Sequence, residues 1–324
     1  MISPRLTRRF LLGASLGATV ASRARAQSGA VRLLVAFPPG GPVDLVARMF
    51  GEQLSKVLGQ TVIIENKAGA NGMLAASEIL RAAPDGATVW FSSVGAVAIN
   101  PALYDKLNYD VVRDFAPVSQ VANNVEVFCV NPKNPANSAA EFVANTKARA
   151  ETTARGSSGI GSIPHLAIEQ LALASGAKLL HVPYKGVAPV VSDVISGQIA
   201  GVFLDVPGAV SFIDGGQLKP LAVAAPRRHP RYPDLKTLEE QGIKGVDTNN
   251  WYGLFVSIKT PPPVIAGLNK AVRAALANRD LSAKMIANGT EPAPSSPEDV
   301  AALLKRDTEK WANLIHVRNI KIEQ

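Results

Sequence analysis

Two glycine-rich stretches offer main-chain N–H groups at points where the chain is expected to enter a helix. The first is Pro38-Pro39-Gly40-Gly41, between an apolar run at 31–35 and an amphipathic segment that begins at Pro42. The second runs from Gly156 to His165, before an apolar segment from Leu166. The first N–H groups of a helix have no acceptor within it and attract anions. The two stretches therefore indicate capture of a carboxylate or phosphate, although an ordinary strand-to-helix turn explains the first equally well.

More specific motifs are absent from these glycine stretches. The spacings G-x-G-x-x-G and G-x-x-x-x-G-K-[ST] do not occur in them, so a nucleotide cofactor is not expected. The histidines His181, His229 and His316 do not have the spacing of metal ligands. Cys129 is the only cysteine and lies in the strand-like run 125–130, where we expect it to pack in the core. We therefore expect neither a cofactor nor a metal.

A hydrolase is the enzymatic alternative. Ser157 or Ser162 could act as nucleophile with His165 and Asp205. A G-x-S-x-G nucleophile elbow is lacking, however, and a serine three residues before a histidine in a glycine loop is more typical of a helix cap or a ligand contact. We expect a binding protein without catalytic residues.

The first 26 residues have the pattern of an export signal. Arg5, Arg8 and Arg9 are followed by a short apolar region, Phe10 to Val20, and by Ala24-Arg25-Ala26 as a cleavage site. A transmembrane anchor needs a longer apolar run, of roughly 20 residues. The sequence around Arg8-Arg9 is similar to a twin-arginine motif, but Gly13 replaces the usual lysine, so the export route stays open. The mature protein is expected to be soluble and periplasmic.

The charge balance changes when this segment is removed. The whole chain has a net charge of +8, and loss of the five arginines in residues 1–26 leaves +3. No basic run is longer than two residues, as at Arg227-Arg228, so nucleic-acid binding is not expected. A small anionic ligand is compatible with this balance.

The order of predicted elements indicates an α/β fold with two lobes. Strands and helices alternate from residue 31, and the pattern begins again at Val125. Such alternation predicts, in each lobe, a mostly parallel sheet flanked by helices, with ligands beyond the carboxyl ends of the strands. We expect residues 27–125 and 251–324 to form lobe one, residues 126–250 to form lobe two, and a ligand cleft between them. The helices expected at 264–277, 281–288 and 298–315 should pack on lobe one.

Several motifs together resemble one family. They are Phe37-Pro38-Pro39-Gly40-Gly41 with Asp44, Glu65-Asn66-Lys67-Ala68-Gly69-Ala70, Pro84-Asp85-Gly86, Asn100-Pro101-Ala102-Leu103-Tyr104, Asp114-Phe115-Ala116-Pro117-Val118, His181-Val182-Pro183-Tyr184-Lys185-Gly186 and Trp251-Tyr252-Gly253-Leu254. They cover essentially the whole mature chain. On these motifs the chain resembles the substrate-binding receptors of tripartite tricarboxylate transporters, also named Bug-type solute-binding proteins.

The resemblance implies a type II-like periplasmic binding fold that closes on its ligand like a Venus flytrap. The ligand would be a small carboxylate, such as a dicarboxylate, an aromatic acid or an acidic amino acid, held by backbone amides and bridging waters. The receptor would be a monomer that meets a membrane permease transiently. Carried over by position, the ligand-binding residues are Phe37, Pro39, Gly40, Gly41, Val43, Asp44, Asn71, Ser93, Ser157, Gly159, Gly161, Ser162, His165 and Asp205. Ala68 and Asn71 depart from the family pattern, so the ligand's identity stays open.

Four questions remain open from the sequence. A ligand sensor for a membrane histidine kinase would use the same closure as a transport receptor. Asp44 either acts on the dipole of its helix and pairs with Arg48, or contacts the ligand. Either Asp44 or Asp205 could pair with a cationic or hydroxyl group of the ligand. Tyr184 and Lys185 either face the cleft or form a structural turn.

Overall fold

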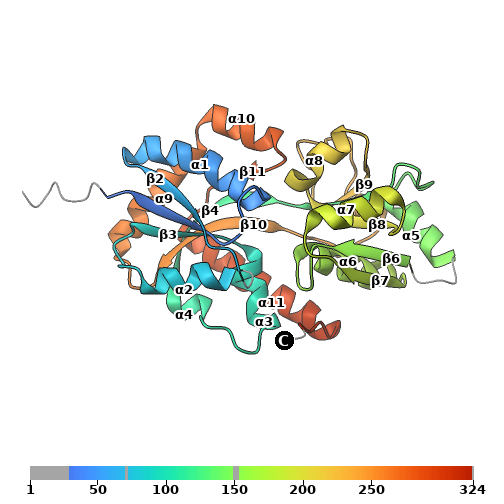
Figure 1. Ribbon diagram of the computed structural model, residues 1–324, viewed down its shortest axis with the longest axis horizontal. Coiled ribbons are helices and arrows are strands. Elements are labelled where there is room, and N and C mark those ends of the chain that lie inside the picture. The colour runs from blue at the N-terminus through green and yellow to red at the C-terminus, as the bar shows by residue number, and fades with distance from the viewer. Residues whose placement is uncertain (1–28, 70–71, 149–152, 323–324) are drawn as a thin grey trace, which may run out of the picture.

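The computed structural model describes residues 29–69, 72–148 and 153–322. Two lobes lie side by side along the longest axis of the molecule (Figure 1). One is built on a six-stranded sheet of order β11-β4-β10-β3-β1-β2, the other on a five-stranded sheet of order β7-β6-β8-β5-β9. Within the described ranges, no helix has both the length and the apolar character needed to cross a bilayer. The expected export signal lies outside these residues.

The first sheet and its helices come from two separate parts of the chain. The first part contains β1 (Val31–Val35), α1 (Pro42–Leu58), β2 (Val62–Asn66), α2 (Met73–Arg81), β3 (Thr88–Ser93), a π-helical turn (Gly95–Ile99), α3 (Asn100–Leu103), α4 (Val111–Asp114) and β4 (Phe115–Asn124). The second part contains β10 (Asn250–Ser257), α9 (Pro262–Leu276), α10 (Arg279–Ala287), β11 (Glu291–Pro292) and α11 (Pro297–Val317).

The second sheet and its helices come from the chain between these two parts. The elements are β5 (Glu126–Val130), α5 (Ala139–Ala148), β6 (Thr153–Ser157), α6 (Ile163–Ser175), β7 (Leu179–Pro183), α7 (Val187–Ser196), β8 (Gly201–Asp205), α8 (Val206–Asp214), β9 (Lys219–Ala224) and a 3₁₀ turn (Glu239–Gln241). The chain passes from one sheet to the other at Val125, between β4 and β5, and returns before β10.

The sheets are mixed, so the expectation of mostly parallel sheets is wrong. β1 lies parallel to β2 and β3, and β6 lies parallel to β7 and β8. The remaining pairs, β3–β10, β10–β4, β4–β11, β8–β5 and β5–β9, are antiparallel. The reason lies at the connections between lobes: β5 and β10, the strands that the chain forms just after each crossing, run against the strands that belong to local strand–helix–strand units. β4 has the direction of β1, β2 and β3 and is antiparallel only to its neighbours β10 and β11.

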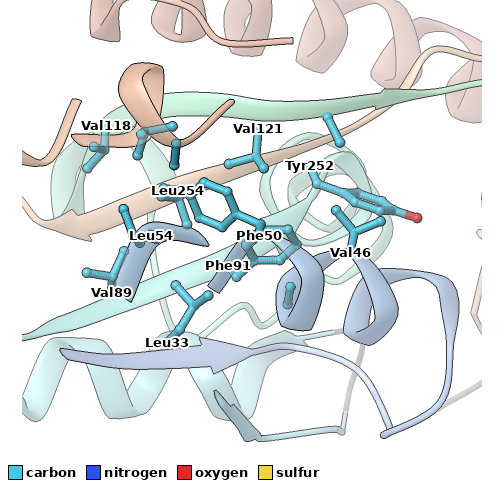
Figure 2. Packing of buried hydrophobic residues seen from close by; sticks show 14 of the residues in the cluster. Leu33, Val46, Phe50, Leu54, Val89, Phe91, Val118, Val121, Tyr252 and Leu254 are labelled. Atoms are coloured by element: carbon cyan, nitrogen blue, oxygen red, sulfur yellow. The ribbon is translucent and has the colours of Figure 1, made fainter. Parts of the chain in front are cut away.

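Two apolar layers cover the first sheet. On one face, β1, β3 and β10 pack against α1, α9 and α10, and Phe50, Phe91 and Leu254 lie in this layer (Figure 2). On the other face Trp90, Trp251 and Trp311 are fully buried, and Nε1 of Trp251 donates to the Asp307 carboxylate at 2.7 Å. Tyr252 lies at the edge of the first layer, with its hydroxyl pointing away from the cluster (Figure 2). The cores thus fix β10 firmly, and its first residues reach the space between the lobes.

Candidate functional site

A cavity of about 1010 Å³ lies between the lobes. Its wall is formed in lobe one by the β1–α1 loop, by Ser93 at the end of β3 and by Tyr252 of β10. In lobe two it is formed by the β6–α6 loop and by the end of β8 at Asp205. Four of these segments follow the carboxyl end of a strand, which is where ligands bind in α/β sheets.

The β1–α1 loop is held in place by a buried carboxylate. Asp44 accepts from the Gly40 amide at 2.9 Å, from Nδ2 of Asn66 at 2.8 Å and from Nε of Arg48 at 2.9 Å. Burial opposes ionisation of Asp44, but these three hydrogen bonds outweigh it and hold the pKa of this carboxyl below its ordinary value. Gly40 has a φ of 80°, which favours glycine. Asp44 is therefore a positioning residue behind the loop, and the expected pair with Arg48 is confirmed.

The β6–α6 loop is held by neutral groups. The Gly161 amide donates to Nδ1 of His165 at 3.0 Å, and the Ser162 hydroxyl donates to the Gly159 carbonyl at 2.7 Å. Ser162 is also the N-cap of α6 and accepts from the His165 amide. Gly161 has a φ of 76°. In both loops, then, a glycine amide donates to the side chain four residues further along.

A row of polar side chains supports this second loop from behind. Oγ of Ser157 lies 2.6 Å from Nε2 of His181, and the His181 ring stacks on the His165 ring with centroids 3.6 Å apart. Burial, and then the neighbouring His165, lower the pKa of His181 to about 4. Beyond His165, Glu169 pairs with Arg318, which follows α11 of the other lobe. Ser157 thus pairs with His181 and not with His165, and it does not line the cavity, which disfavours the hydrolase alternative that uses Ser157 as nucleophile.

Two carboxyl groups meet at the cavity wall in lobe two. Glu126 of β5 and Asp205 of β8 are direct partners in the antiparallel register, and both line the cavity together with Tyr252. Burial, reinforced by the charge of Asp205, raises the pKa of Glu126 well above its ordinary value. Burial also raises the pKa of Asp205 to about 6, against the effect of hydrogen bonds from the Gly208 backbone and Tyr252. Glu126 was not among the residues expected at the site. Its position as a single acid in the apolar run 125–130 could have indicated it.

Most of the residues expected at the ligand site lie on the cavity wall, and three do not. The wall contains Phe37, Pro39, Gly40, Gly41, Val43, Ser93, Gly159, Gly161, Ser162 and Asp205. Asp44, Ser157 and His165 lie behind the loops in the intramolecular contacts described above, and Asn71 falls outside the described residues. The wall also contains Tyr104, Glu126, Ser158, Asn250 and Tyr252, which were not among the ligand-binding residues expected from the sequence.

The remaining candidates near the site are the Tyr184–Lys185 turn and a metal-binding group. The Tyr184 hydroxyl donates to Asp193 at 2.5 Å, which favours the structural interpretation of this turn, and Lys185 is exposed. Among the described residues, no three His, Cys, Asp or Glu side chains come together in a group that could hold a metal ion. The arrangement is suited to binding a small polar molecule between two helix N-termini and a pair of acids.

Relatives of known structure carry ligands of the expected chemical type. An R. palustris protein, Rpa4515, solved with adipate, is 29% identical with a TM-score of 0.83, over 91% of this chain and 99% of that one. MatC from Rhodopseudomonas palustris, solved with bound malate, is 30% identical with a TM-score of 0.77, over 89% of this chain and 99% of that one. Similar solved structures also include a periplasmic transporter and a periplasmic binding protein, so the fold is that of two-lobed periplasmic binding proteins.

Sequence comparison assigns the chain to a family of transport receptors. Protein BugT of Bordetella pertussis is 30% identical over 294 residues, which is 90% of each chain. Residues 46–320 match the family model described as tripartite tricarboxylate transporter family receptor. This family consists of solute-binding receptors and not of enzymes. The chain belongs to the tripartite tricarboxylate transporter receptor family.

Proposed function

We propose that this protein is an extracytoplasmic receptor that captures a small carboxylate between its lobes and delivers it to the membrane permease of a tripartite transporter. The observation that carries the proposal is the pair of glycine loops, one from each lobe, that line the same cavity at the starts of α1 and α6. Relatives solved with adipate and malate support a carboxylate as the cargo.

The proposed mechanism needs no nucleophile. The first N–H groups of α1 and α6 have no acceptors within their helices, and the helix dipoles place partial positive charge at the same two points. A carboxylate that bridges them replaces its water shell with these donors, and the bridge favours the closed arrangement of the lobes. Gly161 and Leu103 come from opposite lobes and lie close together, because a β-carbon at Gly161 would be 2.3 Å from Cδ1 of Leu103. Closure therefore brings the second loop directly onto α3.

The cellular setting belongs to the same proposal. Residues 1–26 would direct export and be cleaved before Gln27, so that the receptor works as a periplasmic monomer. Residues 27–125 with 251–324 would move as one lobe and residues 126–250 as the other, with the hinge at the two places where the chain crosses between the sheets. Rigid lobes joined by short strand connections are the usual basis of hinge closure.

A thermal-shift screen of the chain from Gln27 onward tests the proposal. The panel contains mono-, di- and tricarboxylates, aromatic acids and amino acids. A ligand that binds only the folded state, at a hundredfold excess over its dissociation constant, stabilises the protein by about 2.7 kcal/mol and raises the melting temperature. The bound compound should be recovered unchanged. If none of these carboxylates shifts the melting temperature, the receptor proposal fails.

Gly41 offers a matched pair of variants for this screen. It is the N-cap of α1 with an extended φ of −79°, and a β-carbon there meets only the Pro38 carbonyl, at an ordinary 3.6 Å. Asp and Asn are both good N-caps, so Gly41→Asp and Gly41→Asn should fold. The Asp variant places a negative charge where the ligand carboxylate is expected, and should abolish the thermal shift. The Asn variant, which is neutral, should retain part of it.

A further inference from the structure

The acid pair at the cavity wall is a feature that carboxylate capture does not explain. Glu126 has no exposed surface, and neither of its carboxylate oxygens has a hydrogen-bond partner among the described residues. Its main-chain N–H does have one, since it donates to Oγ1 of Thr248 at 3.1 Å. Buried carboxylate oxygens without donors are costly, and proteins normally satisfy them. The side chain is therefore a buried polar group at the wall of a cavity, and none of the described residues supplies it with a hydrogen-bond partner.

Asp205 is placed differently from its strand partner. A β-carbon at Gly208 would lie 2.5 Å from Oδ1 of Asp205, so this carboxyl packs closely on the backbone at the start of α8. Backbone groups at Gly208 and the hydroxyl of Tyr252 act as its donors. Cross-strand partners on one sheet face have β-carbons about 5 Å apart. Asp205 thus adds a second, better-supported carboxyl beside the unpartnered Glu126.

The described wall of the cavity offers no cation to this pair. Among its described residues there is no lysine, arginine or histidine, and Glu126 and Asp205 are the only charged side chains. A second carboxylate of a ligand would be the third acid at this point and would be repelled. A cationic group of a ligand would instead satisfy the unpartnered oxygens and balance the charge.

We infer that Glu126 and Asp205 form a subsite for a protonated nitrogen, and that the cargo is a carboxylate that also carries an ammonium group, as an amino acid does. This inference rests on the proposed carboxylate receptor and specifies its ligand class. The carboxylate is bound at the helix N-termini of the glycine loops, and the ammonium group is bound between Glu126 and Asp205. The cavity thus recognises a zwitterion by placing donors at one end and acceptors at the other.

The inference has a definite consequence for pH dependence. The titratable groups around Glu126 are Asp205 on β8, Tyr252 on β10 and Cys129 on the same strand, and none of them is cationic. Burial and the neighbouring Asp205 raise the pKa of Glu126, which favours its protonated form in the empty cavity. An ammonium group displaces that proton. Below the pKa of the pair, affinity for a zwitterion should therefore rise up to about tenfold per pH unit, whereas affinity for a ligand that places a carboxylate there should fall.

Isothermal titration calorimetry of the chain from Gln27 onward, between pH 5 and pH 8, tests the inference. The probes are α-amino acids and 4-aminobutyrate, with succinate, glutarate and butyrate as matched compounds that lack the nitrogen. We expect at least one zwitterion to bind with release of a proton and with affinity that rises with pH. The Glu126→Gln variant should weaken that zwitterion at least thirtyfold and remove the proton release, while it strengthens or leaves unchanged the binding of the dicarboxylates.

Controls separate this inference from the proposed function and from misfolding. Gln has the shape of Glu without its charge, so Glu126→Gln should unfold at the same temperature as the wild type or higher. Asp307→Asn makes the same type of change at a buried acid away from the cavity and should leave affinity unaltered. Dicarboxylates that bind while every zwitterion fails, or a zwitterion that is indifferent to Glu126→Gln, overturn the subsite but leave the carboxylate receptor standing. If no probe binds, both are overturned.

Discussion

The two glycine loops have the same architecture but different supports. In each, a glycine amide donates to the side chain of the residue four positions later, which lies in the first turn of the helix. In lobe one that side chain is the Asp44 carboxylate, and in lobe two it is the His165 imidazole. Similar loop geometry is thus obtained once with an ion and once with a neutral ring.

The difference shows how an acid can lie beside an anion site. Asp44 is buried and its charge is compensated locally by Arg48, Asn66 and the Gly40 amide, so the loop that it holds is not strongly negative toward the cavity. Lobe two carries its acidic groups elsewhere, at Glu126 and Asp205, and uses the His165 ring behind its loop. We expect the first loop to be the more stable of the two and the second to be the more sensitive to conditions.

Removal of the charged support should have the largest effect. Asp44→Ala leaves the Gly40 amide and the Asn66 amide without their acceptor and should lower the free energy of unfolding by about 3 kcal/mol. His165→Ala removes one neutral acceptor and a ring stack, and should cost about 1 to 2 kcal/mol. Urea denaturation of both variants measures the two values. Asp44→Asn, which retains an acceptor oxygen, is the control and should lie between Asp44→Ala and the wild type. Equal losses for Asp44→Ala and His165→Ala would remove the distinction between the loops.

Acid should weaken the second loop before the first. The folded protein resists protonation of His181 until about pH 4, whereas the unfolded chain takes up a proton near the ordinary pKa of 6.5. The unfolded state therefore binds more protons in this window, and the stabilisation present above pH 6.5 is lost as the pH falls toward 4. Between pH 7 and pH 5 the loss is up to about 2 kcal/mol. The pKa of Asp44 lies below 3.8, so its contribution persists through this range.

The measurement is the free energy of unfolding against pH for the wild type and His181→Gln. The glutamine can still hydrogen-bond Ser157 but does not titrate. The variant should therefore show a flatter profile between pH 7 and pH 5, and Asp44→Asn should follow the wild-type slope in the same interval. A profile for His181→Gln that runs parallel to the wild type would show that this ring is not what makes the second loop acid-sensitive.

Local sequence patterns predicted most elements of both loops, and tertiary arrangement explains the misses. The strand at Val31–Val35 and the helix from Pro42 follow from an apolar run, a glycine turn and a proline at the first helical position. β4, which spans Phe115–Asn124, was missed because it contains Pro117 and several polar residues and buries two positions in three, so it lacks the alternation of an ordinary strand. It is a strand because it lies between β10 and β11.

The candidate site was predictable where it depends on backbone and not where it depends on pairing across strands. The glycines and prolines of the loops can be recognised directly in the sequence. Glu126 and Asp205 are 79 positions apart, and only the β5–β8 register brings them together. Asp44 and His165 were recognised as important, but their donors and acceptors show that they act behind the loops. Chain direction at the lobe crossings, which makes both sheets mixed, is likewise a tertiary property.

Alanine at the two left-handed glycines should distinguish the loops through closure. Gly40 and Gly161 have φ values of 80° and 76°, so alanine at either should cost about 1 kcal/mol of stability from backbone strain. At Gly40 the new β-carbon meets nothing within 4 Å. At Gly161 it would contact Leu103 of the opposite lobe, so Gly161→Ala should also weaken ligand binding about tenfold. Binding should recover in the Gly161→Ala, Leu103→Ala double variant. Without that recovery, the contact with Leu103 is not what limits closure.

The smallest expected effect concerns the tie between lobes, which only the second loop possesses. Arg318 follows α11 and pairs with Glu169 of α6, beside His165, whereas Arg48 pairs with Asp44 inside lobe one. The Arg318 side chain is 33% exposed, so Arg318→Ala should lower the free energy of unfolding by less than about 1 kcal/mol. It should nevertheless favour the open arrangement, because it removes an ionic contact between the two lobes. Small-angle X-ray scattering without ligand should then give a larger radius of gyration for Arg318→Ala and an unchanged one for Arg48→Ala. The Arg48–Asp44 pair lies within lobe one, so its loss should not change the distance between the lobes. An equal increase in the radius of gyration for both variants would therefore mean that the two loops do not differ in their coupling to closure.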